Sequence, residues 1–335
     1  MSVEVITPGL NTTVQDLGRY GYQQQGVSSC GAMDDLALQM ANLLVGNSSA
    51  DAVLEITMQG PHLLFLQDML IAICGGDFSP TINGNPVSSD RTVWISKGSV
   101  LQFGFVKQGC RAYLAVAGGW DVPIVMGSRS TDLRAGFGGF EGRRLKAGDH
   151  LRANPDGPSS QMIAEQLRSS ASQVSFYQTD WFISRGNFWT SDETVIRVIR
   201  GDQFEQFSDE SRDAFFSQTF QVSPQSDRMG YRLSGPTLSL ISPQELISAA
   251  VAVGTIQVPP NGQPIILMAD RQTIGGYPKI GYVASADLAK VAQFRPGQML
   301  RFEEISPREA QKALYERNLL LRKIKLGMEV YMSGR

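Results

Sequence analysis

The chain has 335 residues, of which 42% are hydrophobic and 19% are charged, and its formal net charge is -2. This length exceeds the usual size of one hydrophobic core, so we expect one large or two modest domains. The small net charge, without a run of Lys or Arg, argues against a nucleic-acid-binding protein. No signal peptide is expected, and the longest apolar stretch, which begins at Leu246, is about half of what a bilayer requires.

The cysteines and histidines exclude two further classes. Cys30, Cys74 and Cys110 form an odd, widely spaced set, which is typical of reduced thiols in a cytosol. His62 and His150 are the only histidines, and their spacing does not suggest a metal site. No P-loop motif is present. We therefore expect a cytoplasmic protein with no metal ligands of its own and no nucleic-acid or membrane partner.

A helix is predicted over residues 33–46, where Leu36 and Met40 begin an apolar face. Asp34 is expected to cap its start, and Gly46 to end it in a left-handed conformation. Short runs rich in Val, Ile, Leu and Phe then recur between turn residues, which favours barrels or sandwiches. We expect strands at residues 53–58, 62–66, 69–74, 92–95, 99–105, 111–117, 194–200, 237–241, 254–259, 264–269 and 299–305.

The predicted fold is mainly β with a few helices, and it has two halves. A polar, Ser-rich segment at residues 154–173 marks the best boundary. We divide the chain into a first β domain (1–155), a linker and aromatic-rich connection (156–190), a second β domain (191–305) and a C-terminal helix (306–335). The aromatic residues between Phe176 and Trp189 are either core or a partner anchor.

Both halves contain the patterns G-P-x-L, at residues 60–63 and 235–238, and G-x-h-L-x-F (h, apolar), at residues 98–103 and 297–302. These repeats indicate a weak internal duplication. The last helix is predicted to start with a capping box, in which Ser306 precedes Pro307 and Glu309. Its apolar face must cover a domain or a partner, and self-association is left open.

Several long motifs occur in order along nearly the whole chain. They are PGLNTTVQDLGRYGYQQQGVSSCGAMD, ANLLVGN, LEITMQGP, YLAVAGGWDVPIVMGSRSTDLRAGFGGFEGR, SDRMGYRL, IQVPPNGQPIILMADRQTIGGYPKIG and VAQF. With these motifs the chain resembles the family of the C-type subunit of 5-oxoprolinase, also described as Kip antagonists, and part of the carboxyltransferase region of urea amidolyase. It departs from the family pattern at Ile274 and Asp202.

The resemblance implies tandem cyclophilin-like β-barrel halves. It also implies a hydrolase that is active only as a complex, in which B-type and A-type subunits join this chain in ATP-dependent cleavage of 5-oxoproline to glutamate. ATP and Mg would act through the complex. Phosphorylating the lactam oxygen makes the amide a better electrophile, and this step needs cations, backbone N–H groups and a carboxylate.

The loop at residues 268–281, which we call the polar loop, holds these groups. We predict catalytic roles for four of its side chains: Asp270, Gln272, Tyr277 and Lys279. Gly275 and Gly276 can present N–H groups to an oxyanion, and Arg271 or Lys279 can neutralise phosphate. The alternative is a hairpin connection whose polar groups are solvated.

Four more residues are predicted to bind substrate or phosphate: Arg228, Ser226, Arg129 and Ser130. The planar fork of Arg228 suits a carboxylate or phosphate; a turn role is the alternative for Ser226. Asp16 and Arg19 are expected to pair with each other, and Cys30 to be an inert thiol rather than a nucleophile.

Two rival functions remain. One is a biotin-dependent carboxyltransferase acting on urea-like amides, with the biotin carried by another protein because the chain lacks a Met-Lys-Met motif. The other is a non-catalytic module that binds a kinase inhibitor.

Overall fold

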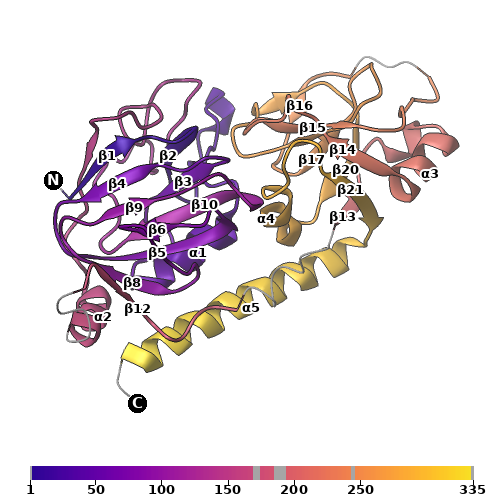
Figure 1. Ribbon diagram of the computed structural model, residues 1–335. Helices are drawn as coiled ribbons and strands as arrows, with labels where there is room; N and C mark the ends of the chain where they lie inside the picture. Colours follow the sequence, from indigo (N-terminus) through magenta and orange to yellow (C-terminus); the bar gives the residue numbers. More distant parts are fainter. Residues whose placement is uncertain (1, 169–173, 185–193, 243–245, 333–335) are drawn as a thin grey trace. The chain divides into compact units, whose positions relative to one another are not determined.

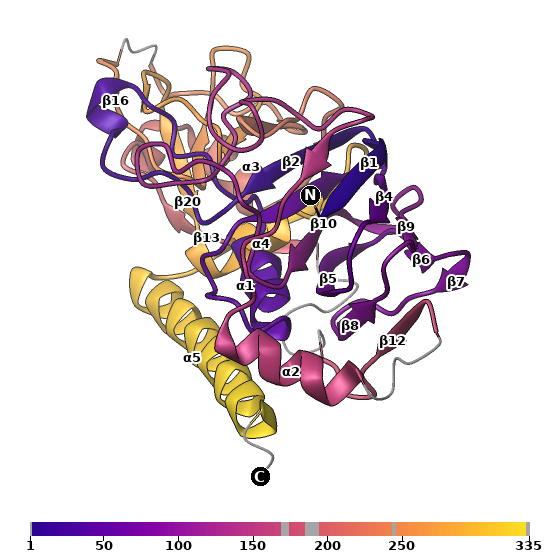
Figure 2. The same cartoon turned by 90° about the vertical axis from the view of Figure 1, so that its left-hand side faces the viewer.

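The computed structural model describes residues 2–168, 174–184, 194–242 and 246–332 (Figures 1 and 2). The chain forms two compact units: unit 1 comprises residues 1–19, 34–185 and 320–335, and unit 2 comprises residues 20–33 and 186–319. Among the described helices, none combines the length and the apolar character that a membrane span requires.

Unit 1 contains two six-stranded sheets. One has the order β11 (His150–Leu151), β1 (Val3–Thr7), β4 (His62–Phe65), β9 (Val100–Gln102), β6 (Thr81–Ile82) and β7 (Asn85–Pro86). The other has the order β12 (Phe176–Gln178), β8 (Thr92–Ile95), β5 (Met69–Asp77), β10 (Gln108–Val116), β3 (Val53–Thr57) and β2 (Asn11–Gln15). Buried residues of both sheets, such as Val5, Ile71 and Leu114, build one core.

The first predicted helix is confirmed as α1 (Asp35–Leu44), which contacts β5 and β10. The Asp34 carboxylate accepts the Ala37 N–H at 2.9 Å, as a capping residue does. Gly46 has a φ of 77°, which confirms the left-handed stop. Helix and sheet therefore meet as the apolar pattern of the sequence indicates.

Unit 2 is built on a closed barrel of seven strands. Their order is β13 (Val195–Arg200), β20 (Lys279–Val283), β17 (Thr255–Gln257), β18 (Ile265–Leu267), β15 (Gly230–Ser234), β14 (Thr219–Val222) and β21 (Met299–Glu304). A separate ribbon pairs β16 (Ala249–Ala250) with β19 (Ile274–Gly275). Two short helices, α3 (Asp209–Ser217) and α4 (Leu288–Val291), complete the unit, and Phe215 of α3 stacks on Phe302 at 4.7 Å between ring centroids.

The G-x-h-L-x-F pattern has the same structure in both units. Gly98 and Gly297 both have left-handed φ angles, of 83° and 88°. The Gly98 N–H donates to the Phe65 carbonyl at the end of β4, and the Gly297 N–H donates to the Val222 carbonyl at the end of β14, each at 2.7 Å. The following Leu and Phe are buried in both cases. The repeat therefore marks equivalent turns before β9 and β21.

The mainly β prediction is confirmed, as is the last helix, α5 (Pro307–Met332), with its capping box. The predicted strand at 237–241 is wrong: only Leu240 forms an isolated bridge, so the second G-P-x-L does not lead into a strand. Within the segment expected to connect the halves, α2 (Pro158–Arg168) and β12 fold with unit 1. Of the aromatic segment, Phe176 packs on the core and Phe182 is 58% exposed, while residues 185–193 lie outside the described residues.

Candidate functional site

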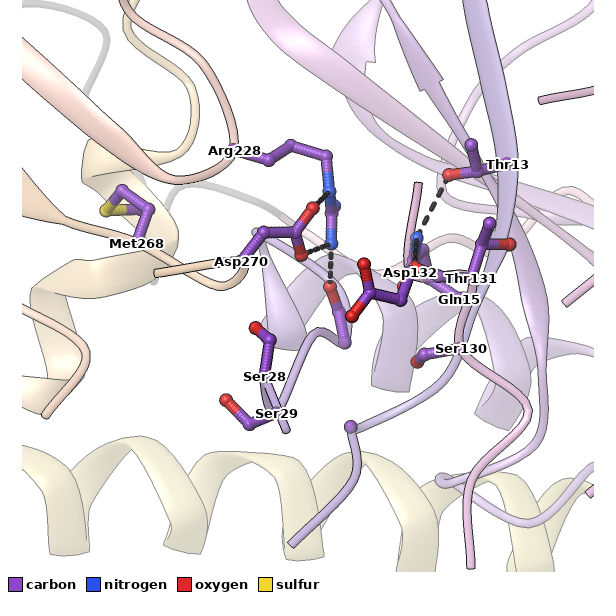
Figure 3. A network of polar contacts seen from close by, with 12 residues as sticks. Thr13, Gln15, Ser28, Ser29, Ser130, Thr131, Asp132, Arg228, Met268 and Asp270 are labelled. Atoms are coloured by element: carbon purple, nitrogen blue, oxygen red, sulfur yellow. Dashed lines mark hydrogen bonds and ion pairs between the residues drawn. The ribbon is translucent and has the colours of Figure 1, made fainter. Parts of the chain in front are cut away.

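The polar loop begins at a buried ion pair. Arg228 Nη2 and Nε donate to the two carboxylate oxygens of Asp270 at 2.7 and 2.8 Å (Figure 3). The two side chains are only 7% and 12% exposed. Nη2 also donates to the Gly31 carbonyl at 2.6 Å. The structure thus brings together two predicted site residues that lie far apart in sequence.

This pairing bears on both predicted roles. The planar fork of Arg228 already holds a carboxylate, which is that of Asp270. Both Asp270 oxygens accept bonds from Arg228, so this carboxylate is arranged as half of an ion pair rather than as an open metal ligand. A catalytic role for Asp270 stays a prediction, and the geometry favours a role in holding the loop.

Arg271 directly follows Asp270 and is half-buried. Its Nη1 donates to Ser29 Oγ at 3.1 Å and its Nε to the Val251 carbonyl at 3.2 Å. In return, Ser28 Oγ donates to the Arg271 carbonyl at 3.3 Å. Burial lowers the pKa of the Arg271 guanidinium.

Residues 28–31 form a corner against the start of the loop. Cys30 and Gly31 both have left-handed φ angles, of 50° and 91°. Such an angle is common for glycine but rare for a residue with a side chain, such as Cys30. The Cys30 side chain is buried and is not part of a disulfide, which agrees with an inert thiol. The sequence analysis did not select Ser28 and Ser29. The SSCG run beside a helix start could have indicated them, but the contacts of these serines with Arg271 are visible only in the fold.

The middle of the polar loop is open to solvent. Gln272 is exposed, and Tyr277 is 47% exposed. Gly275 lies in β19, and a Cβ there would come within 2.6 Å of Gln257 Nε2. Close packing therefore explains this glycine, and the predicted presentation of N–H groups by Gly275 and Gly276 stays a prediction.

Lys279 lies apart from the ion pair. In the barrel, Lys279 pairs in register with Gln257, the last residue of β17. Asp270 lies three residues after Leu267. The Leu267 carbonyl accepts the N–H of Gly254, which directly precedes β17. The structure therefore places Lys279 and Asp270 near opposite ends of β17.

The partner of Lys279 is Asp202, one of the departures from the family pattern. The ammonium lies 3.7 Å from the Asp202 carboxylate, which also accepts the Tyr282 hydroxyl at 2.8 Å. Burial, together with the bond to Asp202, raises the pKa of Tyr282 to about 12.

Ser226 belongs to the β14–β15 hairpin, where its Oγ accepts the Arg232 N–H at 3.1 Å. This geometry supports the turn role. Its predicted binding role, like the others, stays a prediction.

Arg129 and Ser130 belong to a buried cluster in unit 1. Ser130 Oγ donates to Asp16 Oδ1 at 2.5 Å, and the Arg129 backbone N–H donates to Asp16 Oδ2 at 2.6 Å. Arg19 instead donates to the carbonyls of Val125 and Ser130. Among the residues that the structure describes, Asp16 and Arg19 do not pair, so that prediction is wrong. Ser130 is fully buried and supports the loop.

The carboxylates of the candidate site are engaged within the protein, and this bears on metal binding. In the described part of the chain, no three His, Cys, Asp or Glu side chains lie close enough to hold an ion. Carboxylates are the usual protein ligands of Mg²⁺, and those of Asp16 and Asp270 are already bonded within the protein.

The chain is similar to proteins of one class over most of its length. Residues 25–304 match the family "Carboxyltransferase domain, subdomain A and B". The chain is 34% identical to the urea amidolyase of Lachancea kluyveri over 92% of its length, but covers only 17% of that protein. The crystal structure of K. lactis urea amidolyase has a TM-score of 0.86 and 32% identity; the match covers 96% of this chain and 20% of that one.

Two relatives are similar over nearly their whole length. The chain is 42% identical to the C-type subunit of 5-oxoprolinase from Escherichia coli (strain K12), with 93% of this chain and 94% of the relative covered. It is 38% identical to the same subunit from Haemophilus influenzae, with 96% and 97% covered. The chain belongs to the family of C-type 5-oxoprolinase subunits.

Proposed function

We propose that this chain is the C-type subunit of a cytoplasmic, ATP-dependent 5-oxoprolinase, which opens 5-oxoproline to glutamate together with A-type and B-type subunits. The carrying observation is the 42% identity to a C-type 5-oxoprolinase subunit over 93% of this chain and 94% of the relative. Because the match spans nearly the whole of both chains, it supports the same role for this chain. The proposed architecture is a pair of cyclophilin-like halves, supported by the repeated turn at Gly98 and Gly297.

The chemistry places demands on the complex rather than on this chain alone. ATP supplies the phosphoryl group that activates the lactam oxygen, and Mg²⁺ would find its ligands on a partner or on ATP itself. The proposed contribution of this chain is its exposed loop surface. Gln272 can hold the lactam amide and Tyr277 can donate to the developing charge, at a site shared with the B-type subunit.

The test is ATP-dependent glutamate release by the reconstituted complex, with Gln272→Ala and Tyr277→Phe. Both side chains are solvent-exposed, so these changes leave the ion pair at Asp270 intact. Tyr315→Phe is the matched control, because Tyr315 is an exposed tyrosine of α5. We expect each loop variant to lower kcat about 100- to 1,000-fold, the effect of losing one donor that stabilises developing charge. Activity equal to the control in both variants would remove the loop from the site.

The second candidate is a carboxyltransferase subunit. It is favoured by the matching carboxyltransferase family and by the likeness to urea amidolyase structures. Carboxylation of urea by this chain in the presence of a carboxylated biotin-carrier protein, with no glutamate release from 5-oxoproline, would establish it. Assembly with the partner subunits without any turnover would instead favour a binding module.

A further inference from the structure

Two arginines at the start of the polar loop have opposite electrostatic surroundings. The charge of Arg228 is neutralised by Asp270. The bonding partners of Arg271 are the neutral Ser29 hydroxyl and the carbonyls of Val251 and Met268. Within the described ranges of the chain, Arg271 has no carboxylate at ion-pair distance, and its Nη2 donates to no residue.

A half-buried guanidinium without a counter-ion is costly, because desolvation disfavours the charged form. The lowered pKa of Arg271 reflects that burial, and the titratable groups that face it are the Tyr20 hydroxyl and the Cys30 thiol. Neither group is a carboxylate, the planar partner that a guanidinium binds in a two-pronged ion pair. The described residues therefore offer Arg271 no carboxylate partner, and its Nη2 has two N–H groups available for a ligand.

We propose that Arg271 binds the carboxylate of the cyclic amide substrate, with Nη2 as donor and Ser29 Oγ as a second donor. The identity of this substrate rests on the proposed function, whereas the anion site rests on the geometry alone. Ser29 Oγ accepts from Arg271 Nη1, and its own proton has no acceptor among the described residues.

The amount of charge favours a carboxylate over a phosphoryl group. A phosphoryl group carries close to two negative charges at neutral pH. The neighbouring cations of the polar loop are already occupied, Arg228 by Asp270 and Lys279 by Asp202. One uncompensated guanidinium matches a single negative charge.

The first test uses the reconstituted complex and measures KM separately for 5-oxoproline and for ATP. We expect Arg271→Gln to raise the KM for 5-oxoproline about 10- to 100-fold, the effect of a lost charge-assisted hydrogen bond, with the KM for ATP unchanged. Arg271→Lys should recover part of the affinity, and Ser29→Ala should show a smaller rise. Arg301→Gln, an exposed arginine of β21, is the control. A rise in the KM for ATP alone would overturn the assignment to a carboxylate, and no change in either would overturn the anion site.

The second test separates this inference from the proposed function. The full chain alone is titrated with 5-oxoproline, with 2-pyrrolidinone (the same lactam without the carboxylate) and with inorganic phosphate, and the melting temperature is recorded. We expect only 5-oxoproline to raise Tm, and Arg271→Gln to abolish the rise while keeping the unliganded fold. Stabilisation by 2-pyrrolidinone as well, or an undiminished rise in Arg271→Gln, would overturn the inference. Arg271-dependent binding with an inactive wild-type complex would overturn only the proposed function.

Discussion

At the scale of residues, the sequence identified polar groups but not their partners. Arg228 and Asp270 each stood out by chemical type, yet they are 42 positions apart, and nothing local shows that one neutralises the other. The same holds for Asp16, whose bonds to Ser130 and Arg129 cross more than 110 positions. A side chain that looks free in a motif can be fully bonded in the fold. Arg271 differs from these side chains, because its described hydrogen-bond partners are all neutral and none is a carboxylate.

The ion pair gives a stability prediction. Asp270→Ala removes the carboxylate that pairs with the buried Arg228 and should lower the free energy of unfolding by about 3–5 kcal/mol. The double variant Arg228→Met/Asp270→Met removes both charges, so its free energy of unfolding should fall clearly less than that of Asp270→Ala. Urea denaturation of the two single variants and the double variant measures the coupling, and additive losses would show that the pair does not hold the loop.

Tyr282 gives a pH prediction. Its pKa is about 12 in the folded protein, against about 10 in the unfolded chain. The unfolded state therefore loses the proton first as pH rises, so this contribution to stability is present below pH 10 and is lost between about pH 10 and 12. Asp202→Asn removes the second cause but not burial, so the pKa should fall partway towards 10. Ultraviolet titration of the phenolate checks this, and an unchanged pKa would show that Asp202 has no part in it.

At the scale of elements, local patterns predicted most of the structure. The apolar spacing and the capping residues were sufficient to predict α1 and α5. The β-rich runs between turn residues were sufficient to predict most of the strands. The failure at residues 237–241 has a physical reason: a β-rich run becomes a strand only when a neighbour pairs with it, and Leu240 finds a single bridge to Phe207.

The repeated turns give a matched prediction in both units. At Gly98 and Gly297 an added Cβ meets nothing within 4 Å, so only the left-handed φ opposes a side chain. Gly98→Ala and Gly297→Ala should therefore each cost about 1–2 kcal/mol. Thermal unfolding of the two variants compares the costs, and Asn at either site, which tolerates this conformation better, should cost less. A negligible loss of stability at only one of the two sites would show that the two turns are not equivalent.

The capping box of α5 gives a second pH prediction. The bonds from the Ser306 N–H and hydroxyl lower the pKa of Glu309. A lowered folded pKa means that this contribution is present above the unfolded value, about 4.3–4.5, and is lost as pH falls through the folded value. Ser306→Ala removes only the hydroxyl, so the pKa should rise partway. NMR titration of the Glu309 carboxyl measures it, and an unshifted wild-type pKa would contradict the capping box.

At the scale of the whole molecule, composition and strand count predicted a mainly β protein in two parts, and the comparisons show its family. The division itself is less simple than a cut near residue 155. Residues 20–33 fold with unit 2, and the described part of 156–184 folds with unit 1. Such exchanges depend on contacts between distant segments, such as the bond from Arg228 to Gly31, which no local pattern encodes.

The central claim is that this chain is a required subunit of a 5-oxoprolinase. The most direct measurement is ATP-dependent glutamate release from 5-oxoproline by purified A-type and B-type subunits, with and without this chain. We predict turnover only when all three are present, with glutamate formed in proportion to the ATP hydrolysed. Equal turnover without this chain, or none in the full mixture despite assembly, would contradict the account.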